Sequence, residues 1–240
     1  MSDQLTKMLT KGLAVATIVA VAGAISTAPV HALTLTQYTF GTDGTTPVST
    51  PTTTAANVNA NDISGGAGSF AITNYGGENY VNYVGPGSSS TAAAVLDNSY
   101  ITFSANPTGG NVLNLNFLSL DARSSATTTA AIFLRSSLDN YANDIGSVQP
   151  VTTVYPAFSN YNFDLSAPAY QGLVNPVTFR LYAYDTSGDR SYDFDNVTLD
   201  GAATPVPFAF SPLPGLALTW GARIARQKRQ AKKQLAKVEA

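Results

Sequence analysis

The chain lacks the residues on which most enzyme classes depend. Its 240 residues include no cysteine and a single histidine, His31. Without cysteine there is no disulfide framework and no thiol nucleophile. His31 lies in a segment that we expect to be removed, so Ser-His-Asp triads and His-ligated zinc are excluded from the mature protein. Patterns for phosphate and dinucleotide binding are also missing. We therefore expect no enzymatic activity.

Charge is scarce as well, and it is unevenly distributed. Charged residues make up 12% of the chain, about half the usual share. Between Leu33 and Pro207 there are thirteen Asp or Glu, four Arg and no Lys, whereas the tail from Phe208 has seven Lys or Arg and one Glu. The tail could be a solvated helix or a nucleic-acid arm, but an acidic body repels nucleic acid. We expect no nucleic-acid partner.

The first 32 residues have the three parts of a secretory signal. Lys7 and Lys11 precede the charge-free apolar run Leu13–Ile25, and small residues then lead to Ala32. A buried or anchoring helix is the alternative, but the run is short of the roughly 20 residues that span a bilayer. We therefore expect residues 1–32 to be a signal peptide with a helical core, cleaved after export.

The C-terminal residues 204–240 combine an apolar stretch with positive charge. Residues 201–222 carry no charge, and 213–222 suit a short hydrophobic helix that leads into a basic one. Positive charge beyond an apolar stretch stays on the cytoplasmic side and is attracted to anionic lipid. The tail thus predicts a membrane anchor with the body outside. The stop-transfer residues are Arg223, Arg226, Lys228, Arg229, Lys232 and Lys233.

A six-residue motif precedes this anchor. Its residues are Pro207, Phe208, Ala209, Phe210, Ser211 and Pro212. Together with the apolar and basic segments, the motif resembles the sorting tail of the PEP-CTERM class of exported bacterial proteins, in the cyanobacterial variant that reads P-F-E-F-S-P. Ala209 stands where that variant has Glu. The resemblance implies an exosortase-like protease as partner, and a body left at the cell surface or in the secreted polysaccharide matrix.

The body, residues 33–203, is predicted to be an antiparallel all-β domain. Short alternating or aromatic-rich runs are separated by turn-forming clusters, and no repeat suggests a β-helix. Ten short strands favour a two-sheet sandwich, with a jelly roll preferred. The expected strands are Leu33–Phe40, Ser69–Asn74, Tyr80–Val84, Tyr100–Ser104, Val112–Leu120, Ala130–Arg135, Val151–Val154, Tyr161–Leu165, Val177–Tyr184 and Tyr192–Leu199.

Two groups of tyrosines are candidate saccharide-binding residues, because an aromatic ring can cover the apolar C–H groups of a sugar. In the strand Val177–Tyr184 the odd positions are apolar, so Tyr182 and Tyr184 are expected on the opposite, polar face. The second group, each member next to an asparagine, is Tyr75, Tyr80 and Tyr83. Ordinary packing is the alternative for every one of them.

A run of acids suggests calcium. Asp185, Asp189, Asp193 and Asp195 lie close in sequence, and calcium prefers oxygen ligands. The sequence DFDNVTLDG, residues 193–201, resembles the closing strand of PEP-CTERM bodies and of carbohydrate-binding jelly rolls, where an Asp often helps hold a structural calcium. The closing Glu of an EF-hand is missing, and an ordinary polar turn is the alternative. A change in the parity of apolar residues predicts a bulge between Asp195 and Asn196.

The residues leave three functions open. The preferred one is an exported, surface-anchored or matrix-associated structural or adhesive protein without catalysis. The first alternative is a carbohydrate-binding module at the cell surface. A polysaccharide hydrolase that uses carboxylates alone is the least favoured, because Glu78 is the sole Glu before the tail and the acids form no clustered motif.

Overall fold

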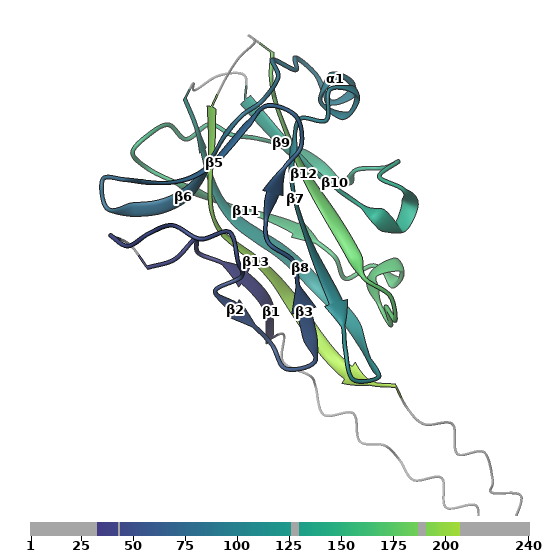
Figure 1. Cartoon of the computed structure of the whole chain (residues 1–240). Helices are drawn as coiled ribbons and strands as arrows, with labels where there is room; N and C mark the ends of the chain where they lie inside the picture. Colours follow the sequence, from purple (N-terminus) through teal and green to yellow (C-terminus); the bar gives the residue numbers. More distant parts are fainter. Residues whose placement is uncertain (1–32, 43, 126–129, 187–190, 207–240) are drawn as a thin grey trace, which may run out of the picture. The chain divides into compact units, whose positions relative to one another are not determined.

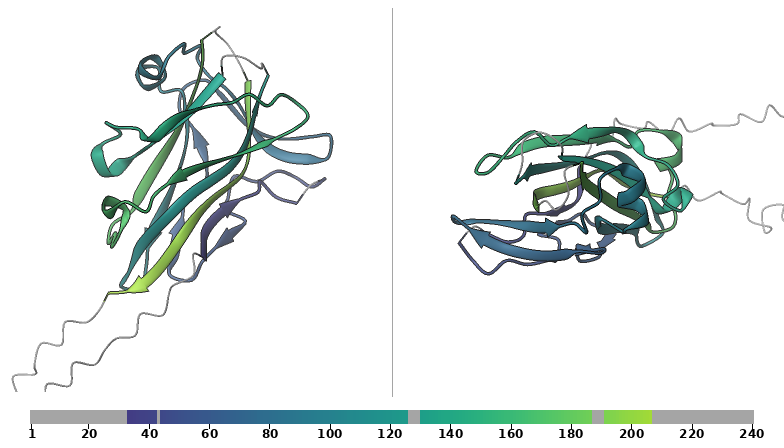
Figure 2. Two further views of the ribbon diagram at one scale, coloured as in Figure 1. Left: turned by 180° about the vertical axis from the view of Figure 1, so that it is seen from behind. Right: turned by 90° about the horizontal axis from the view of Figure 1, so that it is seen from above.

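The computed structural model describes residues 33–42, 44–125, 130–186 and 191–206. They form two antiparallel β-sheets packed face to face, which confirms the predicted sandwich (Figures 1 and 2). Within these ranges no helix has the length and apolar character needed to cross a membrane. The expected signal peptide, sorting motif and basic cluster lie outside the described residues.

The first sheet is built around two long central strands, β8 and β13. Its order is β11-β8-β13-β1-β2, while β6 pairs with β13 and β5 pairs with β6. The strands are β1 (Leu33–Tyr38), β2 (Thr53–Thr54), β5 (Ser69–Tyr75), β6 (Glu78–Val84), β8 (Asn111–Ser124), β11 (Ser159–Asp164) and β13 (Ser191–Pro205). Because β13 is long, it has a different neighbour at each end: residues 191–194 pair with β6, and residues 197–201 with β1.

The second sheet has the order β10-β9-β12-β7-β3, with β4 also paired to β7. Its strands are β3 (Val58–Ala60), β4 (Ser64–Gly65), β7 (Tyr100–Pro107), β9 (Ala130–Ser136), β10 (Ile145–Pro150) and β12 (Val177–Asp185). A short helix, α1 (Thr91–Leu96), packs against β12. Two 3₁₀ turns, η1 (Ser137–Asp139) and η2 (Pro168–Tyr170), complete the described elements.

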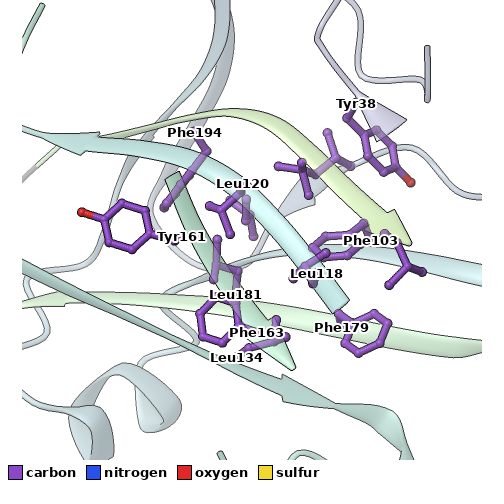
Figure 3. Close-up of a cluster of buried hydrophobic side chains, with 14 of the residues drawn as sticks. Tyr38, Phe103, Leu118, Leu120, Leu134, Tyr161, Phe163, Phe179, Leu181 and Phe194 are labelled. Atoms are coloured by element: carbon purple, nitrogen blue, oxygen red, sulfur yellow. The ribbon is translucent and has the colours of Figure 1, made fainter. Parts of the chain in front are cut away.

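The core lies between the two sheets and follows the period-two pattern of the strands (Figure 3). Val177, Phe179 and Leu181 of β12 are all fully buried, as their alternation predicts. Phe179 stacks on Phe103 of the neighbouring β7, with ring centroids 5.7 Å apart. The aromatic and aliphatic side chains of both inner faces thereby form one continuous apolar layer.

Two sequence predictions need correction. No strand forms at Val151–Val154; the edge strand is β10, Ile145–Pro150, which precedes it. The sequence pattern of β10 does not predict a strand. The segment is a strand because its backbone pairs with β9. The turn-forming cluster between the predicted strands Tyr80–Val84 and Tyr100–Ser104 also contains a helix, since α1 begins at Thr91. Ser90 caps that helix by accepting a hydrogen bond from the Ala93 amide at 3.2 Å, and one and a half turns are too short to show a helical period.

The predicted bulge is confirmed. The register between β13 and β8 shifts between Asp195 and Thr198, and Asn196 adopts a left-handed φ of 49°. Asparagine tolerates this conformation better than most residues, and the Asn196 side chain donates a hydrogen bond to Asp121 at 2.9 Å. The bulge lets the apolar residues on both sides of it face the same core.

Burial of tyrosines predicts a loss of stability at alkaline pH. Burial raises the pKa of Tyr38 to about 12, whereas an unfolded tyrosine titrates near 10. Between these values the folded state binds more protons than the unfolded state. The stabilisation from Tyr38 is therefore complete below pH about 10, and the free energy of unfolding falls by about 2–3 kcal/mol as the pH rises through 12. Urea titrations from pH 8 to 12 measure this, with Tyr38→Phe as the control. An equal decrease of the free energy of unfolding with pH in both proteins would contradict the expectation.

Candidate functional site

An open groove of about 310 Å³ lies where β8 ends and β13 begins. We call it the tyrosine groove. Its volume is at the lower end of the range for small-molecule sites, about 300–1,000 Å³. The residues that line it are Tyr75, Tyr80, Ser124, Ser125, Tyr155, Ser191 and Asp193.

Two exposed tyrosines form the mouth of the groove. Tyr75 ends β5, and a two-residue turn of Gly76 and Gly77, both with positive φ, leads into β6. Such turns require glycine-like conformations at both positions. Tyr155 comes from the loop between β10 and β11, and its ring meets that of Tyr75 edge-on, at 5.6 Å between centroids and 66° between planes. The two side chains are 59% and 52% exposed.

Arg123, near the end of β8, contacts the Tyr155 ring and is fully buried. Its guanidinium carbon is 4.7 Å from the ring centroid of Tyr80, 4.8 Å from that of Tyr155 and 4.1 Å from that of Phe158. Arginine stacks well on aromatic faces because its guanidinium is planar and weakly hydrated. One cation therefore fixes aromatic side chains from two separate segments of the chain.

The charge of Arg123 is balanced by carboxylates. Its Nε donates a hydrogen bond to Asp193 at 2.8 Å, and its Nη1 lies 3.5 Å from Glu78. Nη1 also donates to the carbonyl of Pro156 at 2.6 Å, which ties the Tyr155 loop to the sheet. Asp193 is the direct cross-strand neighbour of Arg123, so the sheet register itself brings this pair together.

Polar groups complete the rim. The Ser191 hydroxyl and the Asp193 carboxylate both accept hydrogen bonds from the amide of Asn82, at 2.6 and 2.7 Å. The Ser125 hydroxyl accepts one from the Ser191 backbone at 3.2 Å. Burial, assisted by the charge of Asp193, raises the pKa of Tyr80, so its phenol stays neutral at physiological pH. Ring faces beside hydroxyls and a carboxylate suit a ligand with both apolar and hydroxyl surfaces.

The tyrosines predicted to bind a saccharide differ in location and burial. Tyr75 and Tyr80 line the groove, whereas Tyr83 is fully buried in the core. Tyr182 does lie on the outer face of β12, but it is only 1% exposed and stacks on Phe133 at 4.8 Å. The outer face of β12 is therefore not available to a saccharide at Tyr182, because α1 packs there and Ala94 joins the cluster of Phe133 and Tyr182.

Tyr184 is half-buried and makes an edge contact with Phe133 at 6.2 Å. Sequence reasoning missed Arg123, Tyr155 and Ser191 of the groove. The one available signal was the rarity of arginine in the body, which has four. Nothing in the sequence indicates that residues 78, 123 and 155 meet.

The predicted calcium ligands are distributed over both sheets. Asp193 is bound to Arg123, and Asp195 accepts a hydrogen bond from the Asn196 backbone at 2.7 Å. Asp185 is buried on β12 of the other sheet, and Asp189 lies outside the described residues. In the part of the chain that the structure describes, no three acidic or histidine side chains gather as a metal site. Calcium binding remains a prediction from sequence.

No family model matches the chain, and no curated protein sequence matches it. Solved structures match it with low scores. An arabinose-bound α-L-arabinofuranosidase has a TM-score of 0.42 and 15% identity, over 70% of this chain and 27% of that one. An endo-1,4-β-D-xylanase 10B of Clostridium thermocellum, solved with xylohexaose, has a TM-score of 0.41 and 13% identity, over 73% and 30%.

A third similar structure is a family 4 carbohydrate-binding module, with a TM-score of 0.34 and 15% identity over 61% of this chain and 95% of that one. The present chain spans less than a third of the two enzyme structures. All three TM-scores are below 0.5, so the function of the groove is judged from its own residues.

Arg123 predicts a large stability effect. Removing one member of a buried ion pair costs about 3–5 kcal/mol, because the remaining charge is left without compensation. Arg123→Met should lower the free energy of unfolding by that amount in urea denaturation. Arg135, which pairs with Asp144 at 2.6 Å but is partly exposed, supplies the matched control: Arg135→Met should cost about 1 kcal/mol or less. Equal losses for the two variants would contradict this assignment.

Proposed function

We propose that the protein binds a saccharide in the tyrosine groove and catalyses no reaction on it. The observation that carries this function is the pair of half-exposed rings, Tyr75 and Tyr155, held over a groove whose rim bears hydroxyls and a carboxylate. Sugars present C–H faces that favour aromatic rings and hydroxyls that favour such polar groups. In a surface or matrix protein, this binding would serve an adhesive role.

Preorganisation of the rings supports binding. Exposed side chains normally lose rotamer freedom when a ligand immobilises them, which weakens affinity. The ring of Tyr155 is already in contact with Arg123 and Tyr75, and the Pro156 carbonyl next to it accepts a hydrogen bond from Arg123. The groove therefore loses little entropy on binding.

The placement of the carboxylates supports a non-catalytic role. Glycoside hydrolysis commonly takes two carboxyl groups on either side of the scissile bond, one as acid and the other as base or nucleophile. At this groove Asp193 and Glu78 both contact the same guanidinium, at 2.8 and 3.5 Å. They serve Arg123 as counter-ions and do not divide those two roles.

We further infer from the sequence that the protein is exported and held at the envelope by its tail until an exosortase-like protease removes that tail. The sandwich suits this arrangement. Leu33 pairs with Gly201, so the described chain begins and ends at the same end of the first sheet (Figure 1). The groove lies at the other end of β13, whose 15 residues span up to about 50 Å. A tail anchored after β13 would leave the groove facing away from the membrane.

The strand order supports the finer assignment of the sandwich as a jelly roll. The eight strands from β6 to β13 pair in a nested way: β6 with β13, β7 with β12, β8 with β11 and β9 with β10. This nesting is what results when a long hairpin is wrapped into two sheets, as in jelly rolls. The wrapping brings the end of β8 next to the start of β13, where the groove forms.

Tyr155→Ala should weaken saccharide binding about tenfold or more, because loss of a stacked ring removes on the order of 1.4 kcal/mol. Tyr75→Ala should do the same. Phe117→Ala is the matched control, since Phe117 is also an exposed aromatic of the first sheet but lies outside the groove. A glycan array followed by calorimetry measures the affinities. Binding that survives both tyrosine variants and fails in the control would refute the groove.

Processing predicts two new termini. Protein isolated from the envelope of its native host should begin at Leu33 and lack the basic tail that follows the motif at 207–212. Intact-mass measurement with terminal peptide sequencing reads both ends. Recovery of the full uncut chain from the cytosol would exclude export.

A further inference from the structure

We propose that the tyrosine groove takes a single, uncharged saccharide chain, and selects against acidic polysaccharides and crystalline polysaccharide surfaces. This inference builds on the saccharide binding proposed above. It rests on two features of the groove, which are the charge around Arg123 and the angle between the two exposed rings.

The charge of the groove disfavours an acidic ligand. Arg123 is the cation that contacts the lining residues, and its charge is already met by Asp193 and Glu78. Two carboxylates around one guanidinium leave this cluster of described residues with a net negative charge. Glu78 is the more exposed, with half of its side chain accessible. A uronate or sulfate group entering here would meet like charge at close range, where the repulsion is only partly screened by salt.

No other described cation can offset this charge. The body contains no lysine and four arginines. Arg135 and Arg180 are on β9 and β12 of the second sheet, whereas the strand residues of the groove belong to the first. Arg135 also has its own partner, Asp144, at 2.6 Å. Arg190 lies outside the described residues. An acidic polymer would therefore find no unsatisfied cation among the described residues that line or contact the groove.

The ring geometry disfavours a flat ligand. A crystalline polysaccharide face presents many parallel chains in one plane, and aromatic rings can bind it together only if they share a plane. Tyr75 and Tyr155 are inclined by 66°, so one ring lies flat on a surface only when the other stands on edge. Rings that are inclined in this way and in contact with each other instead form a corner against which one chain can lie, with Ser125, Ser191 and Asp193 on the rim to bind its hydroxyls.

The full mature protein can be tested on three kinds of probe. Soluble neutral polymers are hydroxyethyl cellulose, xyloglucan and galactan; acidic polymers are alginate and polygalacturonate; the crystalline probe is microcrystalline cellulose. Affinity electrophoresis and calorimetry serve the soluble probes, and pull-down serves the crystalline one. We expect binding to at least one neutral polymer, with affinity that changes less than about twofold between low and high salt.

The outcomes separate this inference from the function on which it rests. Binding to acidic polymers alone, or to crystalline cellulose alone, would overturn the inference and leave saccharide binding in place, provided that Tyr155→Ala abolishes it. Absence of binding to all three kinds of probe, in a protein with a cooperative thermal unfolding transition, would overturn both.

A charge variant tests the selection directly. Glu78→Gln keeps the size of the side chain and one acceptor oxygen but removes its charge. The ratio of its alginate affinity to its neutral-polymer affinity, measured at low salt, should rise several-fold over that of the unaltered protein because repulsion is reduced. Unchanged exclusion of alginate by this variant would contradict the role assigned to charge. Thermal unfolding of the variant checks that the fold is retained.

Discussion

The groove depends on one buried cation. Arg123 has no exposed surface, and removing a guanidinium from water is costly unless its charge and its donors are matched. Here carboxylates of two strands, a loop carbonyl and three aromatic rings match the charge and the Nε and Nη1 donors, while Nη2 has no hydrogen-bond partner among the described residues. Those same contacts hold the Tyr155 loop and the β5–β6 hairpin against the sheet. The surface that we propose for binding is the outer side of this charge-matched cluster.

The length of β13 links this cluster to the rest of the molecule. Its first residues pair with β6 and carry Asp193, and its later residues pair with β1, where the described chain begins. The bulge at Asn196 joins the two halves without turning either apolar face to solvent. One strand therefore positions the groove at one end of the sandwich and the two ends of the described chain at the other, as the proposed tail anchor requires.

Much of the fold was predictable because alternation is a local property. Nine of the ten expected strands formed, and the apolar face of Val177–Ala183 is buried as its pattern predicts. The misses were elements with weak local signals, such as the edge strand Ile145–Pro150 and the single capped helix Thr91–Leu96. That short helix had a consequence for the candidate residues, because it packs over Tyr182, which the alternation had placed on the polar face of its strand.

The sequence by itself determined most of the strands, their buried faces, the bulge and the acidic, lysine-free character of the body, because each follows from residues that are neighbours along the chain. It also singled out Tyr75 and Tyr80 as candidates. Only the tertiary structure decided that these meet Tyr155 and Arg123, since the contacts join β5, β6, β8 and the loop before β11. Contacts between such distant segments are set by sheet register and strand order, which local patterns do not encode.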